Sequence, residues 1–287
     1  MDLFDINVIK PLLAEHGFRF SKAKGQNFLT ARWVPERIAY ESGVDSGCGV
    51  LEIGPGVGVL TSELCRAAGR VCAVELDRLL IPVLGTTLAG FDNVTVIEGD
   101  ILKLDIPELV GREFPGLHPC VCANLPYNIT TPVLSAIIDS GCFERITVMI
   151  QREVARRICS RPGSADYGAF TVYANYHTEP EILFDVPPDC FIPRPKVYSS
   201  VISLRPRSEK QPVRSEDMLF RVVRASFSQR RKTLANGLAS SFGDRLSKDE
   251  LTDIIRSCGF GEMVRGETLG IAEFALLSDR LSEALGD

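Results

Sequence analysis

The chain has 287 residues, of which 45% are hydrophobic and 24% charged, so it is long enough for a large domain and a small second one. Its nine cysteines are irregularly spaced and it has only three histidines, which argues against a disulfide framework or a structural zinc site and favours reduced thiols. The net charge of −5 argues, by itself, against a nucleic-acid partner.

The sequence predicts neither a secretory signal nor a membrane span. The first ten residues, MDLFDINVIK, carry acids where a signal peptide needs cations. The uncharged run 114–138 contains four prolines, which a membrane-spanning helix does not normally tolerate. We therefore expect a cytoplasmic protein that does not enter a membrane.

Strand-like runs alternate with helical patterns over the first two thirds of the chain. The strand-like runs cover 50–53, 70–75, 94–98, 120–123 and 146–150, and the helical patterns cover 60–68, 79–88 and 131–139. This alternation predicts an α/β fold, with a mostly parallel, Rossmann-like sheet covered by helices on both faces. The stretch 181–204 is strand-like again without a long intervening helix, which predicts an antiparallel edge to the sheet.

The last third of the chain is predicted to be helical. The polar stretch 205–215 reads as a linker, and helical patterns follow at 216–227, 231–241, 248–257 and 271–285. We therefore expect two domains, 1–205 and a small helical domain at 206–287. Between residues 191 and 240 there are eleven lysines and arginines against three acids, a local net charge of +8 that leaves −13 for the rest. Such a stretch is either a phosphate-binding patch or a solvated, charge-rich surface.

A glycine-rich turn follows the first predicted strand. The sequence VLEIGPGVG at 50–58 enters a predicted helix, and glycines there let the backbone approach a ligand near free N–H groups. Glu75 ends the next strand, where it can accept the hydroxyls of a ribose, and Asp100 follows the third, where it can accept from an adenine amine. Three such strand ends predict an adenosine-bearing cofactor, and either NAD or S-adenosylmethionine fits. Taken singly, each is also compatible with a turn or a helix cap.

The fourth strand end, Asn124-Leu125-Pro126-Tyr127, separates these two cofactors. The Asn124 side-chain oxygen and the Leu125 carbonyl can accept both hydrogens of an exocyclic amine, with the backbone held by Pro126. Tyr127 can stack on a base, which must be unpaired or flipped out. The pattern therefore predicts methyl transfer to a base amine at Asn124, Leu125, Pro126 and Tyr127. The alternative is a loop with a buried tyrosine.

Segments along most of the chain resemble the ribosomal RNA adenine dimethyltransferase family, specifically its small-subunit, 16S-type members. The matching segments are KGQNFL at 24–29, EIGPGVG at 52–58, Glu75, Asp100, NLPY at 124–127, FIPRPKV at 191–197 and FSQRRKTL at 227–234. The resemblance implies a class I methyltransferase fold that uses S-adenosylmethionine and no metal. It also implies the product N6,N6-dimethyladenosine at two adjacent adenosines of small-subunit RNA, with a role in subunit biogenesis.

The resemblance also implies roles for individual residues. The implied cofactor contacts are Asn27, Leu29, Gly54, Gly56, Glu75, Asp100 and Asn124. Phe191 is expected to be a second stacking surface opposite Tyr127. The triplet Arg230-Arg231-Lys232 is expected to contact RNA phosphates or to dock the domains, the alternative being a cationic helix start or a salt-bridge partner.

Several alternatives remain open at this level. Arg152, Arg156 and Arg157 could extend an RNA surface or form the exposed face of a helix. The expected partner is small-subunit RNA, free or in an immature subunit, bound by a monomer. Rival functions are a large-subunit methyltransferase of the antibiotic-resistance type, an assembly factor whose binding role dominates, and a nicotinamide-dependent oxidoreductase, which leaves NLPY unexplained.

Overall fold

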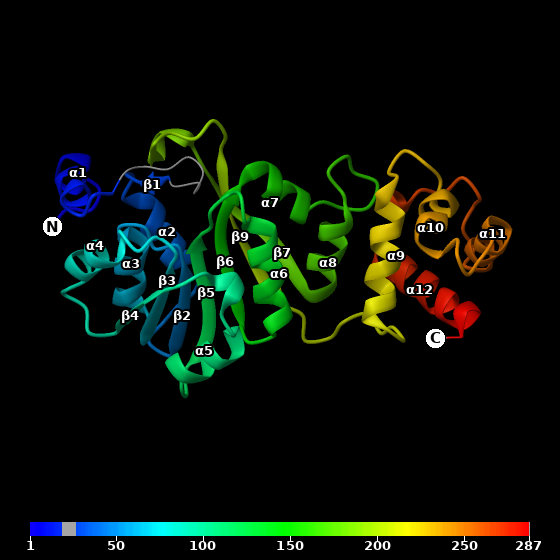
Figure 1. Cartoon of the computed structure of the whole chain (residues 1–287), viewed down its shortest axis with the longest axis horizontal. Helices are drawn as coiled ribbons and strands as arrows, with labels where there is room; N and C mark the ends of the chain where they lie inside the picture. The colour runs from blue at the N-terminus through cyan, green and yellow to red at the C-terminus, as the bar shows by residue number, and fades with distance from the viewer. Residues whose placement is uncertain (19–26, 287) are drawn as a thin grey trace. The chain divides into compact units, whose positions relative to one another are not determined.

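The computed structural model describes residues 1–18 and 27–286, which form two compact units (Figure 1). The first unit comprises Met1–Ala155 and Pro180–Pro206, and the second comprises Arg156–Glu179 and Arg207–Asp287. The division after Pro206 lies one residue from the predicted boundary. The segment Arg156–Glu179, however, packs with the C-terminal helices, whereas the sequence pattern placed it in the first domain.

In the described part of the chain, seven strands form one mixed sheet in the order β4-β3-β2-β5-β6-β9-β7. The strands are β2 (Cys48–Ile53), β3 (Arg70–Glu75), β4 (Val94–Glu98), β5 (His118–Asn124), β6 (Arg145–Gln151), β7 (Thr178–Val186) and β9 (Ser199–Pro206). The five strands β2, β3, β4, β5 and β6 run parallel to one another, whereas β9 pairs antiparallel with β6. The prediction of a mostly parallel sheet with an antiparallel edge is confirmed.

The sheet core explains the strand sequences. Every residue of β2 is buried, because a central strand is covered on both faces and therefore reads as a continuous apolar run. Residues of α3 such as Leu60 and Leu64 pack into the same core cluster as Val50. The helices of this part of the chain are α1 (Ile6–Glu15), α2 (Trp33–Glu41), α3 (Val59–Ala67), α4 (Ile81–Thr87), α5 (Ile106–Glu113), α6 (Thr130–Ser140) and α7 (Arg152–Ile158).

A short antiparallel pair lies apart from the main sheet. It consists of β1 (Phe28–Leu29) and β8 (Phe191–Ile192), with Leu29 opposite Phe191. The pair joins two segments that the sequence analysis treated separately, the end of KGQNFL and the start of FIPRPKV. Residues 24–26 of the first motif lie outside the described residues.

The second unit is helical, as the sequence predicted. Its helices are α8 (Ala169–His177), α9 (Glu216–Ser228), α10 (Leu234–Phe242), α11 (Lys248–Ser257) and α12 (Ile271–Leu285). Ser215 caps α9 by accepting a hydrogen bond from the Met218 amide, and Ser247 forms a capping box with Glu250 at the start of α11. The apolar faces of these helices share one core that includes Leu219, Leu238 and Leu277.

Candidate active site

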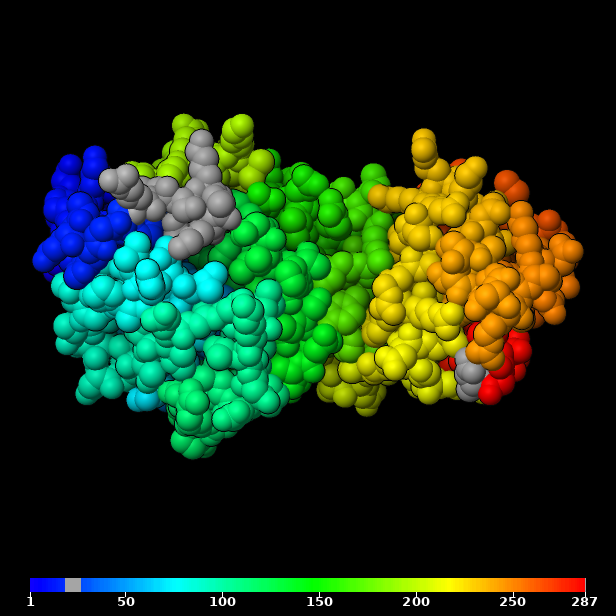
Figure 2. All heavy atoms as spheres, in the orientation of Figure 1, coloured from blue at the N-terminus to red at the C-terminus, as the bar shows by residue number. Residues whose placement is uncertain are grey.

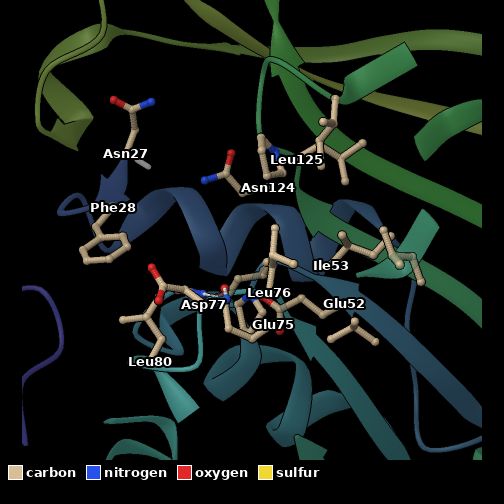
Figure 3. Close-up of a pocket in the computed structure, with 18 of the residues that line it drawn as sticks. Asn27, Phe28, Glu52, Ile53, Glu75, Leu76, Asp77, Leu80, Asn124 and Leu125 are labelled. Carbon is tan, nitrogen blue, oxygen red and sulfur yellow. Dashed lines mark hydrogen bonds between the residues drawn. The ribbon is translucent and has the colours of Figure 1, made fainter. Parts of the chain in front are cut away.

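A cavity of about 230 Å³ lies at the carboxyl ends of the parallel strands of the first unit (Figure 3). Parallel α/β sheets bind ligands at this edge, because the loops after successive strands converge there. The lining consists of 27–29, 52–57, Val59, Leu60, 74–77, Leu80, 99–101 and 124–129. All residues that the sequence analysis expected to contact the cofactor, and all four residues of NLPY, therefore border this one cavity.

The glycine turn forms one wall of the cavity. Gly54, Gly56 and Gly58 have positive φ angles of 70°, 62° and 88°, in the left-handed region that favours glycine. A Cβ atom added at Gly56 would lie 3.3 Å from the ring of Phe28 on β1, so the turn is also closely approached. Helix α3 starts directly after Gly58, which leaves its first amides near the cavity.

Glu75 ties the end of β3 to the glycine turn. Its Oε2 accepts a hydrogen bond from the Gly56 amide at 3.3 Å, and its Oε1 accepts one from the Asp77 amide at 2.8 Å. Burial raises the pKa of Glu75, and the two amide hydrogen bonds act to lower it. The carboxyl is thus fixed in orientation, and each oxygen retains acceptor capacity for a ligand hydroxyl.

Asp100 both borders the cavity and caps a short helix. It lines the cavity, and its Oδ1 accepts a hydrogen bond at 3.1 Å from the Leu102 amide, which caps the short 3-10 helix Ile101–Lys103. Lys103 lies 3.8 Å from the other carboxylate oxygen. The cap fixes this carboxylate beside the cavity without using up its acceptor sites.

Glu52 is a buried acid whose importance the sequence analysis missed, although it lies inside the glycine motif. It is 1% exposed, lines the cavity, and its Oε2 has no hydrogen-bond partner among the described residues. Burial raises the pKa of Glu52 to about 8, the nearby Thr61 hydroxyl acts to lower it, and the negative charge of Glu75 raises it further. At neutral pH this carboxyl is therefore mostly protonated.

The NLPY segment forms the opposite wall. Figure 3 shows the side-chain amides of Asn124 and Asn27 on one side of the cavity, with Glu75 and Asp77 on the other. The Leu125 amide donates to the Met149 carbonyl at 3.0 Å, which anchors this segment to β6. Asn124 is partly exposed, so its amide is accessible from the cavity.

A hydrogen bond holds the hydroxyl of Tyr127. Its Oη lies 2.5 Å from the Oγ of Ser199, the first residue of β9, and either hydroxyl can donate. Burial raises the pKa of Tyr127, and the Ser199 hydroxyl acts to lower it. The ring is partly exposed and borders the cavity, as a stacking surface requires.

Phe191 does not occupy the position that the resemblance suggested. Its side chain is 2% exposed and packs in the core beneath the β1–β8 pair, and it does not belong to the cavity lining. The expectation that Phe191 stacks on a base opposite Tyr127 is therefore not met in this structure. Strand pairing with Leu29 holds the ring inward instead.

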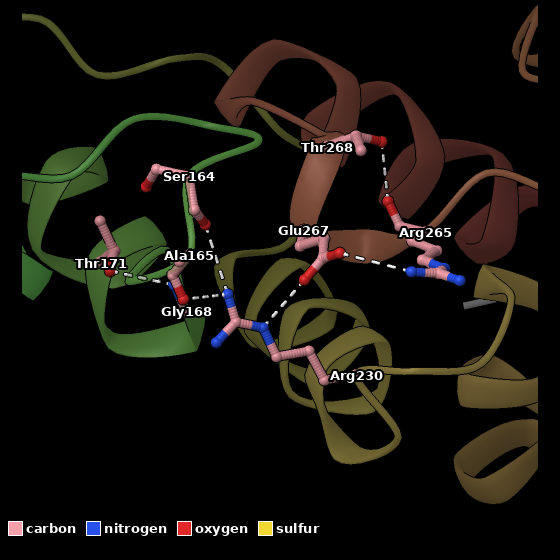
Figure 4. Close-up of polar contacts among 8 residues, drawn as sticks. All are labelled: Ser164, Ala165, Gly168, Thr171, Arg230, Arg265, Glu267 and Thr268. Carbon is pink, nitrogen blue, oxygen red and sulfur yellow. Dashed lines mark hydrogen bonds and ion pairs between the residues drawn. The ribbon is translucent and has the colours of Figure 1, made fainter.

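The three cations Arg230, Arg231 and Lys232 lie in the second unit and differ in their contacts. Arg230 pairs with Glu267 at 2.9 Å and donates to the carbonyls of Ser164 and Ala165 (Figure 4). It is thus a salt-bridge partner within its unit, one of the alternatives that the sequence left open. Arg231 and Lys232 are exposed, and their contact with RNA remains a prediction.

The described residues offer neither a membrane span nor a metal site. No helix within 1–18 or 27–286 is long and apolar enough to cross a membrane. The same residues contain no group of three or more histidines, cysteines and acids that could hold a metal ion. All nine cysteines are free thiols, and burial raises the pKa of Cys65 and of Cys72 to about 12.

Comparison with known proteins gives consistent matches over nearly the whole chain. Residues 17–270 match the sequence model of the family described as "Ribosomal RNA adenine dimethylase". "Ribosomal RNA small subunit methyltransferase A" of Lachnoclostridium phytofermentans is 44% identical over 277 residues, which cover 96% of both chains. The protein of the same name from Streptococcus pneumoniae is 42% identical over 285 residues, or 98% of both chains.

Solved structures share the fold. A dimethyladenosine transferase from Plasmodium falciparum aligns with a TM-score of 0.72 over 87% of this chain and 95% of its own, at 24% identity. The 23S rRNA methyltransferase ErmE aligns with a TM-score of 0.67 over 89% of this chain and 99% of its own, at 25% identity. The sheet is therefore the Rossmann-like sheet of methyltransferases, and the chain belongs to the ribosomal RNA adenine dimethylase family.

Proposed function

We propose that the chain transfers methyl groups from S-adenosylmethionine to the N6 amines of adenosines in small-subunit ribosomal RNA, giving N6,N6-dimethyladenosine. The observation that carries this proposal is the meeting of NLPY with the glycine turn, Glu75 and Asp100 around one cavity. The alternative of a nicotinamide-dependent oxidoreductase does not explain the NLPY segment at this cavity. The relatives at 41–44% identity all carry the name of a small-subunit methyltransferase, which favours that substrate over large-subunit RNA.

The residues around the cavity fit S-adenosylmethionine chemically. Its ribose hydroxyls need acceptors, which the oriented carboxyl of Glu75 supplies, and its adenine amine needs an acceptor such as Asp100. The left-handed glycines at 54 and 56 allow its methionine and ribose portions to approach the backbone. Asn27 and Leu29 border the cavity from β1. When bound, the cofactor supplies an electrophilic methyl group on a sulfur that leaves readily.

The chain's own residues then have to orient the amine. An adenine N6 amine is a weak nucleophile because its lone pair is conjugated with the ring. The Asn124 side-chain oxygen and the Leu125 carbonyl hold its two hydrogens and direct the lone pair toward the methyl group. Orientation of this kind lowers a barrier by roughly 7–11 kcal/mol. Tyr127 stacks on the base, which has to be unpaired or flipped out.

The second methylation places a further demand on the same acceptors. After the first transfer the nitrogen loses one proton, so the monomethyl amine keeps a single hydrogen. One of the two acceptors retains that hydrogen, and the other releases the position that the first methyl group now fills.

The proposal also covers the form of the enzyme and of its substrate. We propose that the chain acts as a monomer, on immature small subunits, in the cytoplasm.

The test uses S-adenosylmethionine with a labelled methyl group. Purified protein is offered unmethylated small subunits, large subunits and naked RNA in parallel, and nucleosides from the digested RNA are identified by mass spectrometry. Labelled dimethyladenosine from small subunits supports the proposal. Label in large subunits instead points to the resistance-type activity, and binding to small subunits without any label points to an assembly factor.

A further inference from the structure

An exposed aromatic ring lies beside the candidate active site without a role in the proposed chemistry. Tyr198 precedes β9 directly and is 42% exposed. The guanidinium carbon of Arg152 lies 4.3 Å from the centre of its ring, and the Arg152 amide donates to the Tyr198 carbonyl at 3.0 Å. Backbone and side chain together fix this arginine on the tyrosine.

The position of this pair follows from the sheet. Gln151, the last residue of β6, is opposite Ser199, the first residue of β9, so Arg152 and Tyr198 lie just beyond the carboxyl end of β6. Asn124 ends the neighbouring strand β5 at the same edge, opposite Met149. Two strand spacings, about 10 Å, separate β5 from β9. A nucleotide next to one held at Asn124 can bridge such a distance.

A direct contact connects the pair to the active site. Ser199 follows Tyr198 in the chain, and its Oγ lies 2.5 Å from the Oη of Tyr127. The same short segment therefore holds the tyrosine of NLPY and presents a second aromatic ring at the surface. The loop that precedes β9, yellow-green in Figure 2, lies at the surface of the first unit and exposes two further cations, Arg194 and Lys196.

The chemistry of the pair suits an unpaired base. Bases splayed out of RNA stack on aromatic rings and on guanidinium planes, and neighbouring cations contact the phosphates. The charge of Arg152 is only partly neutralised, since its Nη1 lies 3.7 Å from Oδ2 of Asp185, while Oδ1 of the same carboxylate accepts a hydrogen bond from the Ser200 hydroxyl. A cation over an exposed ring adds little stability, so fold stability does not account for this arrangement.

We propose that Tyr198 and Arg152 form a stacking platform for the unpaired nucleotide adjacent to the target adenosine. This inference rests on the proposed function, because it needs the target base at Asn124 and Tyr127. The platform contributes to RNA binding and leaves the chemical step and the cofactor unchanged. It also predicts that the ring is required and the hydroxyl is not.

The test compares steady-state methylation of unmethylated small subunits by the wild-type protein and by Tyr198→Ala, Tyr198→Phe and Tyr198→Trp. Loss of one base stack raises KM for the subunit roughly 5- to 150-fold in Tyr198→Ala. The value of kcat at saturating subunits and the Kd for S-adenosylmethionine should stay at wild-type levels. Phe and Trp should restore KM, which a role for the tyrosine hydroxyl would not allow. Arg152→Lys keeps the charge but loses the planar group, so its KM should also rise.

The matched control is Tyr40→Ala. Tyr40 is 83% exposed near the end of α2, where the chain turns toward the start of β2, so it lies toward the amino edge of the sheet. If the wild-type protein makes dimethyladenosine but Tyr198→Ala and Arg152→Lys both behave like Tyr40→Ala, the platform is overturned and the proposed function is not. Wild-type protein that makes none overturns the proposed function, and the platform with it.

Discussion

Replacing Glu52 by glutamine should make the stability of the ligand-free protein much less dependent on pH. The carboxyl is 1% exposed, one of its oxygens has no partner among the described residues, and Glu75 is a second acid nearby. Its folded state therefore favours the protonated form, with the pKa raised from 4.5 to about 8. Glutamine keeps the size of the group and cannot ionise.

The magnitude follows from the raised pKa. A folded state that holds a proton more tightly than the unfolded chain gains stability that is fully present below about pH 4.5 and is lost as the pH rises to about 8. In that range each pH unit changes the free energy of unfolding by about 1.4 kcal/mol. The whole interval corresponds to about 5 kcal/mol, of which about 4 kcal/mol falls between pH 5 and pH 9.

The assay is urea unfolding at each pH from 5 to 9, with a reductant present because the cysteines are free thiols. The free energy of unfolding of Glu52→Gln minus that of the wild type should increase by about 4 kcal/mol across this range. Glu98→Gln removes an exposed carboxyl at the end of β4 and should follow the wild-type curve. Parallel curves for wild type and Glu52→Gln would refute the reasoning, because they would mean that Glu52 ionises as easily when folded as when unfolded.

Four further predictions concern the reaction and the second unit. Asn124→Ala should lower turnover roughly 10²- to 10³-fold and leave the affinity for RNA unchanged. Single-turnover methylation measures the first quantity and RNA titration the second. Near-normal turnover would remove Asn124 from the mechanism. Tyr127→Ala should lose more activity than Tyr127→Phe, because stacking needs the ring, and equal losses would point to the hydroxyl. Arg230→Ala should lower the free energy of unfolding by about 1–2 kcal/mol in urea titrations, since it removes the Glu267 ion pair and a donor to two carbonyls. Arg231→Ala should leave that value unchanged and reduce the salt dependence of RNA binding by about 0.7–0.9 in log–log slope, whereas an unchanged slope would exclude its phosphate contact.

The sheet could be predicted from the sequence because its strands are short, apolar and clearly bounded. The ranges 70–75 and 94–98 coincide with β3 and β4, and each other predicted strand of the parallel sheet differs from the structure by two residues or fewer at either end. Residues far apart in sequence, such as Gly54 and Asn124, could be expected at one cavity because parallel strands end at a common edge.

Features that depend on tertiary packing could not be predicted in this way. The burial of Phe191 follows from its pairing with Leu29, more than 160 residues earlier, which no local pattern reports. Arg230 finds its partners at Ser164 and Glu267, again distant in sequence. Helix α8 joins the C-terminal unit although it precedes two strands of the sheet, so alternation of elements alone assigns it to the wrong side of the boundary.

The proposed function places different steps of the reaction at different strand ends along the carboxyl edge of the sheet. In the proposed function, the glycine turn, Glu75 and Asp100 at the ends of β2, β3 and β4 bind the cofactor, and the end of β5 supplies the acceptors that orient the amine. The proposed stacking platform lies beside β5, where β6 ends and β9 begins, and would contact the RNA strand that continues from the target base. This arrangement requires that variants at β2 to β4 change cofactor affinity, those at β5 change turnover, and those at the β6–β9 end change the KM for RNA. A variant that changed all three quantities at Tyr198 would contradict that division.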